Sequence, residues 1–300
     1  MHRLGRARFP LLPRFLRSVR TLLPDSSVPF ASAFCLLYSD PSSCFHQMHP
    51  DNVYESDLLV DQYLLFHYGS AEDQLPYLAG PRDALFYPIR CVSDFLPSIG
   101  VVERALDLGC AVGRSTFELS RWAPEVVGID LSHRFIAAAN RVRETGRIEI
   151  RRLEEGELVT PVTRELPPEL SRDRCRFEIG DATELPTNLG QFDVVLAANL
   201  IDRVKAPRNL LDSFSAIVRP GGHLILSSPY TWLEAFTPKS AWLGGRYGPG
   251  GNAARTLDGI KDALLGPFVH QSTKDLPFVI REHARKYQWS VAQATVWKRR

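Results

Sequence analysis

The stretch that decides the fold is Leu106-Asp107-Leu108-Gly109-Cys110-Ala111-Val112-Gly113-Arg114. It closes the short apolar run Arg104–Leu108 and opens the helix-like segment Ser115–Trp122. Glycines in a turn between a strand and a helix let the backbone approach a ligand closely, and the N–H groups of the turn and of the helix start point toward that ligand. The stretch therefore predicts a cofactor site at a strand-to-helix turn.

Two further acids follow the next two strand-like runs. Val126–Ile129 is followed by Asp130, 17 residues after Gly113, and Arg174–Ile179 leads to Asp181. A carboxylate at the end of the second strand accepts hydrogen bonds from ribose hydroxyls, and Asp181 is expected near an adenine edge. The residues predicted to bind the cofactor are Asp107, Gly109, Cys110, Ala111, Gly113, Asp130, Leu131, Asp181, Ala182 and Asn199.

Strand-like and helix-like runs alternate through the middle of the chain. The strand-like runs are Arg104–Leu108, Val126–Ile129, Arg174–Ile179, Phe192–Ala197 and His223–Ser227, and the helix-like runs include Ser115–Trp122, a helix capped by Ser132 and ending near Val142, and Leu210–Val218. Such alternation predicts an α/β fold with a mostly parallel sheet and helices on both faces. Phe278–Ala284 and Ala292–Trp297 leave no room for a crossover helix between them, so they should pair antiparallel.

Two cofactor classes could use the glycine turn. A dinucleotide site requires G-x-G-x-x-G beside a pyrophosphate, whereas this chain has an acid, Asp107, two residues before Gly109, and its next glycine is Gly113. An acid is unsuited to a pyrophosphate but suits the cationic methionyl amine of S-adenosylmethionine. An NAD-dependent enzyme is therefore a distant alternative.

The turn resembles the signature of class I methyltransferases, and so does Pro220-Gly221-Gly222 before the fifth strand. The resemblance implies a Rossmann-like α/β fold with a mostly parallel seven-stranded sheet, an antiparallel C-terminal strand and S-adenosylmethionine as cofactor. Class I methyltransferases usually carry a further glycine where Ala111 stands here. A β-carbon at this position should narrow the cofactor loop without abolishing binding.

Composition and charge limit the classes of partner that the chain is expected to bind. The chain has 300 residues, is 44% hydrophobic and carries a net charge of +2. Residues 1–47 hold six arginines, no lysine and two acids, so residues 48–300 have 30 basic and 32 acidic groups, a net charge of −2. Base-modifying methyltransferases place Asn/Asp-Pro-Pro-Tyr/Phe after strand 4, but this chain has Ala197-Ala198-Asn199-Leu200-Ile201-Asp202-Arg203. We expect no nucleic-acid and no membrane partner.

The arginine-rich opening divides the chain into three expected parts. Residues 1–47 are a leader, 48–100 an N-terminal helical cap with helices near Val53–Tyr68 and Tyr87–Leu96, and 101–300 the methyltransferase domain. The leader has three interpretations: a start assigned too early, with Met48 as the true one; a segment for organelle import; or a disordered tail. We expect the enzyme to work in the cytoplasm.

Cysteines and histidines give no sign of a metal or a disulfide framework. The five cysteines are odd in number, widely spaced and without C-x-x-C, and His46 and His49 lack a following ligand cluster. This pattern favours free thiols in a reducing compartment and predicts no metal site.

A narrower resemblance covers about Tyr54 to Arg299. Several stretches are similar to the methyltransferase module at the C-terminus of the ovothiol-synthesising enzyme, the 4-mercaptohistidine N1-methyltransferase family. They are Tyr63–Gly69, Leu106–Arg114, Ala197–Arg203, Ser228–Glu234, Trp242–Gly245, Asp275–Glu282 and Thr295–Trp297. Several of these stretches lie outside the generic cofactor core, which makes the likeness more specific than one of fold.

This resemblance implies S-adenosylmethionine-dependent methylation of an imidazole nitrogen of 5-thiohistidine, which gives ovothiol. In the fused enzymes an iron-dependent sulfoxide synthase makes the precursor, but no H-x-x-x-H-x-E run occurs among the eight histidines here. A separate synthase is therefore the expected supplier of substrate. The alternatives are a methyltransferase for another small imidazole, thiol or amine, and a non-catalytic cofactor-binding regulator.

Candidates for acceptor binding follow from their place in the predicted sheet. Active sites of open parallel sheets lie beyond the carboxyl ends of the strands. Asn199 and Asp202 follow strand 4, and Tyr230 and Trp232 follow strand 5 as expected aromatic walls. Arg281 is a candidate for the acceptor carboxylate.

Each of these candidates also has a structural interpretation. Asp202 could cap a helix or pair with Arg203, and Tyr230 and Trp232 could belong to the core. Tyr63, Phe66 and Tyr68 are interpreted as helix packing residues, while His67 is a candidate member of a lid. Cys110 is interpreted as a small filler of the loop.

Overall fold

The computed structural model describes residues 53–248 and 250–300, so the predicted leader, Cys35 and Cys44 lie outside the described residues. The described residues all belong to one compact unit. In the described part of the chain, no helix combines the length and the apolar character needed to cross a bilayer. The same part holds no cluster of three or more metal-ligating side chains.

A seven-stranded sheet in the order β10-β11-β7-β6-β1-β2-β5 organises the fold. Its parallel strands are β1 (Arg104–Leu108), β2 (Glu125–Asp130), β5 (Cys175–Ile179), β6 (Phe192–Ala198) and β7 (Val218–Ser228). β10 (Phe268–His283) and β11 (Lys286–Arg299) form the antiparallel hairpin, and β11 pairs antiparallel with β7. The predicted fold is confirmed: a Rossmann-like, mostly parallel seven-stranded sheet with antiparallel C-terminal strands.

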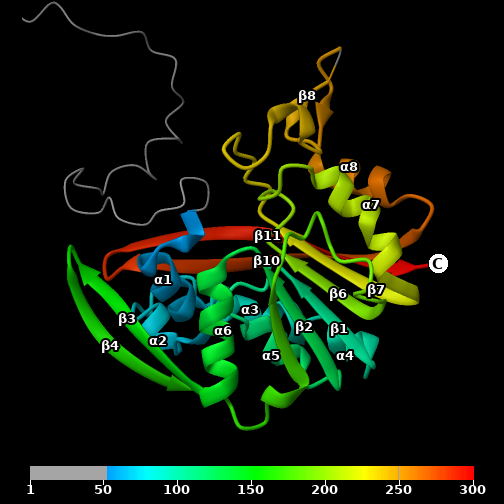
Figure 1. The fold of residues 1–300 in the computed structure, drawn as a ribbon. Helices are drawn as coiled ribbons and strands as arrows, with labels where there is room; N and C mark the ends of the chain where they lie inside the picture. The colour runs from blue at the N-terminus through cyan, green and yellow to red at the C-terminus, as the bar shows by residue number, and fades with distance from the viewer. Residues whose placement is uncertain (1–52, 249) are drawn as a thin grey trace, which may run out of the picture. The chain divides into compact units, whose positions relative to one another are not determined.

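Helices cover both faces of the sheet and form two apolar clusters with it (Figure 1). The helices are α1 (Asp57–Tyr68), α2 (Ala71–Gln74), α3 (Tyr87–Ser93), α4 (Leu96–Ile99), α5 (Arg114–Leu119), α6 (His133–Thr145), α7 (Pro207–Ile217) and α8 (Thr256–Leu264). Residues of α1, α3, α5 and α6 share one cluster, and residues of α7 and α8 share the other. Because both faces are covered, β1 and β6 are buried along almost their whole length.

Local signals explain where several helices begin and end. Ser132 caps α6 as predicted, its Oγ accepting from the N–H of Phe135 at 3.1 Å. Ser56 caps α1 in the same way, so the predicted helix over Val53–Tyr68 is divided into a 3-10 turn at Val53–Glu55 and α1. The predicted helix Tyr87–Leu96 ends earlier, at Ser93.

The helices before the sheet are an integral part of the fold. The hydroxyl of Tyr68 in α1 donates to the carbonyl of Val112 at 2.7 Å, and Ser115 in α5 donates to the carbonyl of Pro88 in α3 at 2.9 Å. These bonds hold α1 and α3 against the turn that follows β1. The expected cap over 48–100 is thus packed within the same compact unit as the sheet.

A second hairpin, β3 (Arg147–Glu155) and β4 (Leu158–Glu165), is absent from the predicted elements. It follows α6 and lies beside α1 and α2 at one end of the molecule (Figure 1). Few of its side chains are buried, among them Ile148, Ile150 and Val162. Its sequence is dominated by charged residues, so apolar alternation is too short there to indicate a strand pair. The short hairpin of β8 (Arg246–Tyr247) and β9 (Ala253–Ala254) completes the fold.

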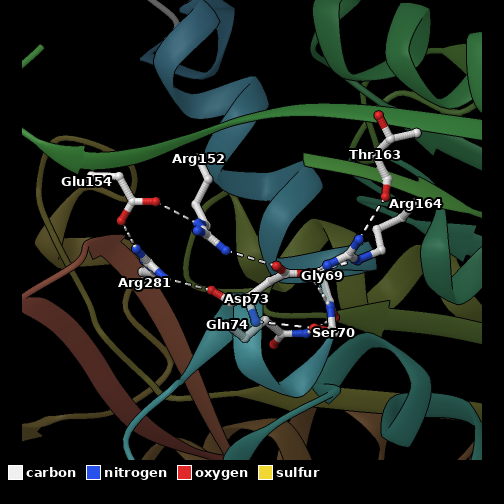
Figure 2. Close-up of polar contacts among 9 residues, drawn as sticks. All are labelled: Gly69, Ser70, Asp73, Gln74, Arg152, Glu154, Thr163, Arg164 and Arg281. Carbon is white, nitrogen blue, oxygen red and sulfur yellow. Dashed lines mark hydrogen bonds and ion pairs between the residues drawn. The ribbon is translucent and has the colours of Figure 1, made fainter. Parts of the chain in front are cut away.

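A polar network fastens β3–β4 to the rest of the molecule (Figure 2). The carboxylate of Asp73, in α2, accepts from Nη1 of Arg152 at 2.9 Å and from Nε of Arg164 at 2.7 Å. Arg281 of β10 donates to the backbone oxygen of Asp73 at 2.9 Å and to Oε2 of Glu154 at 2.5 Å. Three arginines from three strands thus converge on one short helix.

Candidate active site

A cavity of about 130 Å³ lies where the turns after β1, β2 and β6 meet the N-terminal helices. It is lined by Tyr54, Tyr63, Phe66, His67, Tyr87, Pro88, Gly109, Ala111, Ser115, Asp130, Phe135, Ala198, Asn199, Leu200, Arg203 and Ile280. The carboxyl edge of the parallel strands is the place that the sequence predicts for the site. Gly109, Ala111, Asp130, Asn199 and His67 are the predicted site residues that line it.

The turn after β1 is fixed by β2. The N–H groups of Gly109 and Cys110 donate to the carbonyl of Ile129 at 2.8 and 3.1 Å. One carboxylate oxygen of Asp130 accepts from the N–H of Ala111 and the other from the N–H of Ser132, both at 2.9 Å. Asp130 therefore braces the turn and also lines the cavity, where it could accept from ribose hydroxyls.

The two glycines of the turn have different reasons to be glycine. Gly109 has φ +71° and lines the cavity. A β-carbon at Gly113, which has φ +91°, would lie 2.7 Å from the ring of Phe177. Gly113 is thus required by packing between the turn and β5, a reason that the motif alone does not reveal.

Ala111 occupies a backbone conformation that favours glycine, with φ +48°. A residue with a β-carbon in this region costs about 1–2 kcal/mol.

We predict that Ala111→Gly raises the free energy of unfolding by about 0.5–1 kcal/mol and Tm by about 1–3 °C. Thermal unfolding measures this effect. Ala137→Gly, in exposed helical backbone of α6, is the matched control and should destabilise by about 1 kcal/mol. Equal destabilisation by both variants would contradict the prediction.

The electrostatics of the turn suit a cationic ligand. Burial raises the pKa of Asp107 to about 7, although the hydroxyl of Thr116, 2.7 Å from its Oδ2, opposes this. Burial also raises the pKa of Asp130, against the hydrogen bonds from backbone N–H groups. Neither carboxylate takes part in the ion pairs of residues 53–248 and 250–300. Two uncompensated buried acids fit S-adenosylmethionine and would repel a pyrophosphate.

The other predicted cofactor residues lie around this turn but not in the cavity wall. Cys110 is buried beneath the turn and burial raises its pKa well above the ordinary value, as expected of a filler. Leu131 is exposed beside Asp130, and Ala182 is buried. Asp181 accepts from the N–H and hydroxyl of Thr183 at 2.7 and 2.6 Å. Their contact with a cofactor stays a prediction.

Asn199 and His67 are two of the polar residues that line the cavity. Asn199 has φ +51°, a conformation that Asn tolerates better than most residues. Its Oδ1 accepts from the hydroxyl of Tyr87 at 2.8 Å, so its NH₂ group remains for the cavity. His67 is 9% exposed, its Nδ1 has no hydrogen-bond partner in the structure, and burial, with Arg114 nearby, lowers its pKa to about 3. The imidazole is therefore neutral at physiological pH.

Asp202 holds the edge of the sheet together and does not line the cavity. It is fully buried, and its carboxylate accepts from Ser228 Oγ at 3.0 Å, from the N–H of Thr231 at 2.9 Å and from Arg203 Nη1 at 3.0 Å. These partners engage both oxygens, which agrees with the structural interpretation that pairs Asp202 with Arg203, and a role of Asp202 in acceptor binding stays a prediction. Its partner Arg203 lines the cavity instead.

Tyr230 and Trp232 also lie outside the cavity lining. Tyr230 has φ +55°, and its hydroxyl pairs with Oε1 of Gln293 in β11 at 3.0 Å. Trp232 is buried and donates to the hydroxyl of Thr256 in α8 at 2.9 Å. The chain turns after β7 and directs both rings toward β11 and α8. The expected aromatic walls come instead from Tyr54, Tyr63, Phe66, Tyr87 and Phe135.

Arg281 lies in the polar network of the β3–β4 hairpin. Its guanidinium is engaged by Glu154 and by the backbone of Asp73, and only 4% of its side chain is exposed (Figure 2). Arg281 thus belongs to the β3–β4 network and is not among the residues that line the cavity, whereas its neighbour Ile280 is. Its predicted role toward an acceptor carboxylate stays a prediction.

A family model described as a methyltransferase domain matches residues 83–255, more than half of the chain. The chain belongs to this methyltransferase family. Residues 83–255 accordingly form a methyltransferase domain, and S-adenosylmethionine is the cofactor of this family. The match begins within the N-terminal helices and includes the turn after β1, Asp130 and Asn199.

Curated relatives of this methyltransferase match only part of the chain. It is 32% identical over 104 residues to magnesium-protoporphyrin O-methyltransferase of Rhodobacter capsulatus, covering 35% of each chain. It is 26% identical over 126 residues to ubiquinone biosynthesis O-methyltransferase of Marinobacter nauticus, covering 42% of this chain and 44% of that one. The chain thus spans less than half of the length of these relatives.

Similar solved structures are methyltransferases as well. Magnesium protoporphyrin IX methyltransferase from Synechocystis PCC 6803 with bound SAH has a TM-score of 0.48 at 16% identity, over 82% of this chain and 97% of that one. The N-methyltransferase NodS from Bradyrhizobium japonicum WM9 has a TM-score of 0.44 at 15% identity, over 80% of this chain and 98% of that one.

Proposed function

We propose that this methyltransferase transfers a methyl group to an imidazole nitrogen of 5-thiohistidine in ovothiol biosynthesis. The observation that carries the proposal is the make-up of the cavity: neutral His67 and the NH₂ group of Asn199 lie among aromatic rings. Such walls suit a flat ring, and the two polar groups can orient it. The stretches similar to the ovothiol methyltransferase module supply the substrate's identity.

The size of the cavity supports a small acceptor. Its volume of about 130 Å³ is below the roughly 300–1,000 Å³ of sites that enclose drug-sized ligands. The enclosed space therefore suits the reacting ends of two ligands, such as a methyl donor and a single ring. The side chains of Tyr63, Phe66, Tyr87 and Phe135 supply apolar walls around this space.

Bound S-adenosylmethionine supplies an electrophilic methyl group, which a neutral nitrogen lone pair must approach in line. The chain's contribution is orientation and exclusion of water. Asn199 presents its NH₂ group as a hydrogen-bond donor. A hydrogen bond from this group to the reacting ring nitrogen would occupy the lone pair that must attack the methyl group. We infer that Asn199 instead holds the thiolate, which keeps this competing nucleophile from the methyl group. Nδ1 of neutral His67 is buried without a hydrogen-bond partner, and we infer that it hydrogen-bonds to the bound ring, as acceptor or donor according to its tautomer.

Asn199→Gly tests this assignment without backbone strain, because glycine tolerates φ +51°. We predict that kcat/KM for 5-thiohistidine falls about 10- to 100-fold, as expected for one hydrogen bond to a charged group, and that the fraction of S-methyl product rises. Labelled S-adenosylmethionine and product analysis measure both quantities. Asn252→Gly, in an exposed turn, is the matched control. No transfer to 5-thiohistidine by the unaltered enzyme would end the proposed function.

A second candidate is methyl transfer to oxygen, because the relatives from Rhodobacter and Marinobacter are named as O-methyltransferases. Their matches cover less than half of either chain, which is too little to infer that this chain uses the same acceptor. Hydroxylated ring compounds, histidine and other small thiols or amines belong in the same assay. Tight cofactor binding without turnover on any of them would favour a regulatory module.

The proposal implies a separate iron-dependent sulfoxide synthase that supplies thiohistidine. A coupled assay tests this link: the synthase, its substrates and the methyltransferase together should yield ovothiol. An iron-dependent synthase in the neighbouring reading frame would support the same pairing.

A further inference from the structure

Arg203 is the only Arg or Lys among the described residues that line the cavity. It follows β6 by five residues and stands beside Asn199 and Leu200 in the lining. A quarter of its side chain is exposed, so the guanidinium is within reach of a ligand without being freely solvated. A cation at this depth favours an anionic group on whatever occupies the cavity.

The guanidinium is held rigidly from one side. Nη1 of Arg203 donates to the backbone oxygen of Asp202 and to its Oδ2, both at 3.0 Å, and to the carbonyl of Thr231 at 2.9 Å. Asp202 is itself fixed by Ser228 and Thr231. The ring of Phe236 lies under the guanidinium, 5.0 Å from its carbon. The orientation of the planar group is therefore determined before any ligand arrives.

The bonds to Asp202 and Thr231 leave two nitrogens of the guanidinium for other partners. All hydrogen bonds to Asp202 and Thr231 leave from Nη1, while Nε and Nη2 carry three further N–H groups. Arg203 also hydrogen-bonds to the hydroxyl of Tyr54: burial raises the pKa of Tyr54, and the charge of Arg203 and this hydrogen bond oppose the rise. Both residues line the cavity, and together they offer a fork of donors plus a hydroxyl. A carboxylate is the group that such a fork binds bidentately.

We propose that Arg203 and Tyr54 bind the carboxylate of the acceptor. They take the role for which the sequence offers Arg281, and they define the acceptor as a small molecule that carries a carboxylate beside its reacting ring. The inference rests on the proposed function for the identity of the ring, but the subsite itself requires only a carboxylate. The methionyl end of the cofactor carries the same group, so the experiment must distinguish the two sources.

Arg203→Lys keeps the charge and loses the fork, and Tyr54→Phe loses the hydroxyl. For 5-thiohistidine we expect Arg203→Lys to raise KM about 10- to 100-fold, with kcat changed much less. For the analogue of 5-thiohistidine that lacks the carboxylate, KM should be high and equal in the unaltered enzyme and in Arg203→Lys. Tyr54→Phe should raise KM about 3- to 10-fold. Arg208→Lys, an exposed arginine paired with Asp212 in α7, is the matched control, and thermal unfolding verifies that each variant is folded.

Two outcomes of this assay overturn the inference. A weaker affinity for S-adenosylhomocysteine in Arg203→Lys, with KM for the acceptor unchanged, would assign the arginine to the cofactor's own carboxylate. An equal rise of KM for 5-thiohistidine and for its decarboxylated analogue would show that Arg203 acts on the ring or on the fold.

Acetate keeps the test independent of the proposed function. If the unaltered enzyme does not methylate 5-thiohistidine, binding of acetate to the S-adenosylhomocysteine complex is measured by nuclear magnetic resonance. Weaker acetate binding in Arg203→Lys than in the unaltered enzyme and in Arg208→Lys would support a carboxylate subsite. Equal acetate binding in all three proteins would overturn it.

Discussion

Asp130→Ala should weaken the binding of S-adenosylhomocysteine about 100- to 10,000-fold, the largest loss that we expect from a single change in the cofactor site. If Asp130 accepts from two ribose hydroxyls, each lost bond to a charged acceptor costs about 1.5–3 kcal/mol. The carboxylate also binds the N–H groups of Ala111 and Ser132. The substitution therefore loosens the turn that would carry the methionyl part of the cofactor.

Calorimetry with S-adenosylhomocysteine measures this loss, and Asp212→Ala provides the control because Asp212 is an exposed acid of α7. Asp130→Asn separates the two roles, since an amide keeps one oxygen acceptor for the turn and removes the charge. Unchanged affinity in a folded Asp130→Ala variant would mean that the ribose lies elsewhere.

The architecture was predictable because local patterns and long-range packing agree. β1 and β6 are buried at nearly every position, β2 ends in the acid that braces the turn, and the final hairpin has no room for a crossover. The β3–β4 hairpin was not predictable in this way. It is held by Asp73 and its arginines as well as by three buried apolar side chains, Ile148, Ile150 and Val162. The pairing of charges distant in sequence leaves no periodic signal.

The cofactor half of the site was easier to predict than the acceptor half, for a physical reason. A strand-to-helix turn is local, so Gly109, Ala111 and Asp130 could be placed from their neighbours in sequence. The acceptor walls come from helices that precede the turn. Helical spacing places Tyr63 and Phe66 on a buried face, but it does not distinguish packing from the wall of a cavity.

The arginines show the same limit. Arg203 and Arg281 are both near the carboxyl edge of the sheet, and only tertiary contacts decide which one reaches the cavity. Arg281 donates hydrogen bonds to Glu154 and to the backbone of Asp73, whereas Arg203 donates to Asp202 and lines the cavity. Sequence order carries no information about these partners.

Asp73→Asn should lower the free energy of unfolding by about 2–4 kcal/mol and Tm by about 5–15 °C. The carboxylate is buried, with its side chain 5% exposed, and it compensates Arg152 and Arg164, which are 21% and 37% exposed. A fully buried broken pair costs about 3–5 kcal/mol, and partial exposure of the arginines reduces this value. Loss of the charge releases β3–β4 from α2 (Figure 2). Urea unfolding of the variant measures the effect, with Asp212→Asn as the exposed control.

The pH dependence of this difference identifies its cause. Burial alone would raise the pKa of Asp73, but hydrogen bonds from Ser70 and Arg164 outweigh it and hold the pKa below its ordinary value of 3.8. The unfolded chain therefore binds more protons than the native chain as the pH falls below about 4–5. The advantage over Asp73→Asn should be constant above about pH 5 and shrink as the pH falls through the native pKa. A difference that stays the same down to the acid limit of folding would mean that packing, and not charge, holds the hairpin.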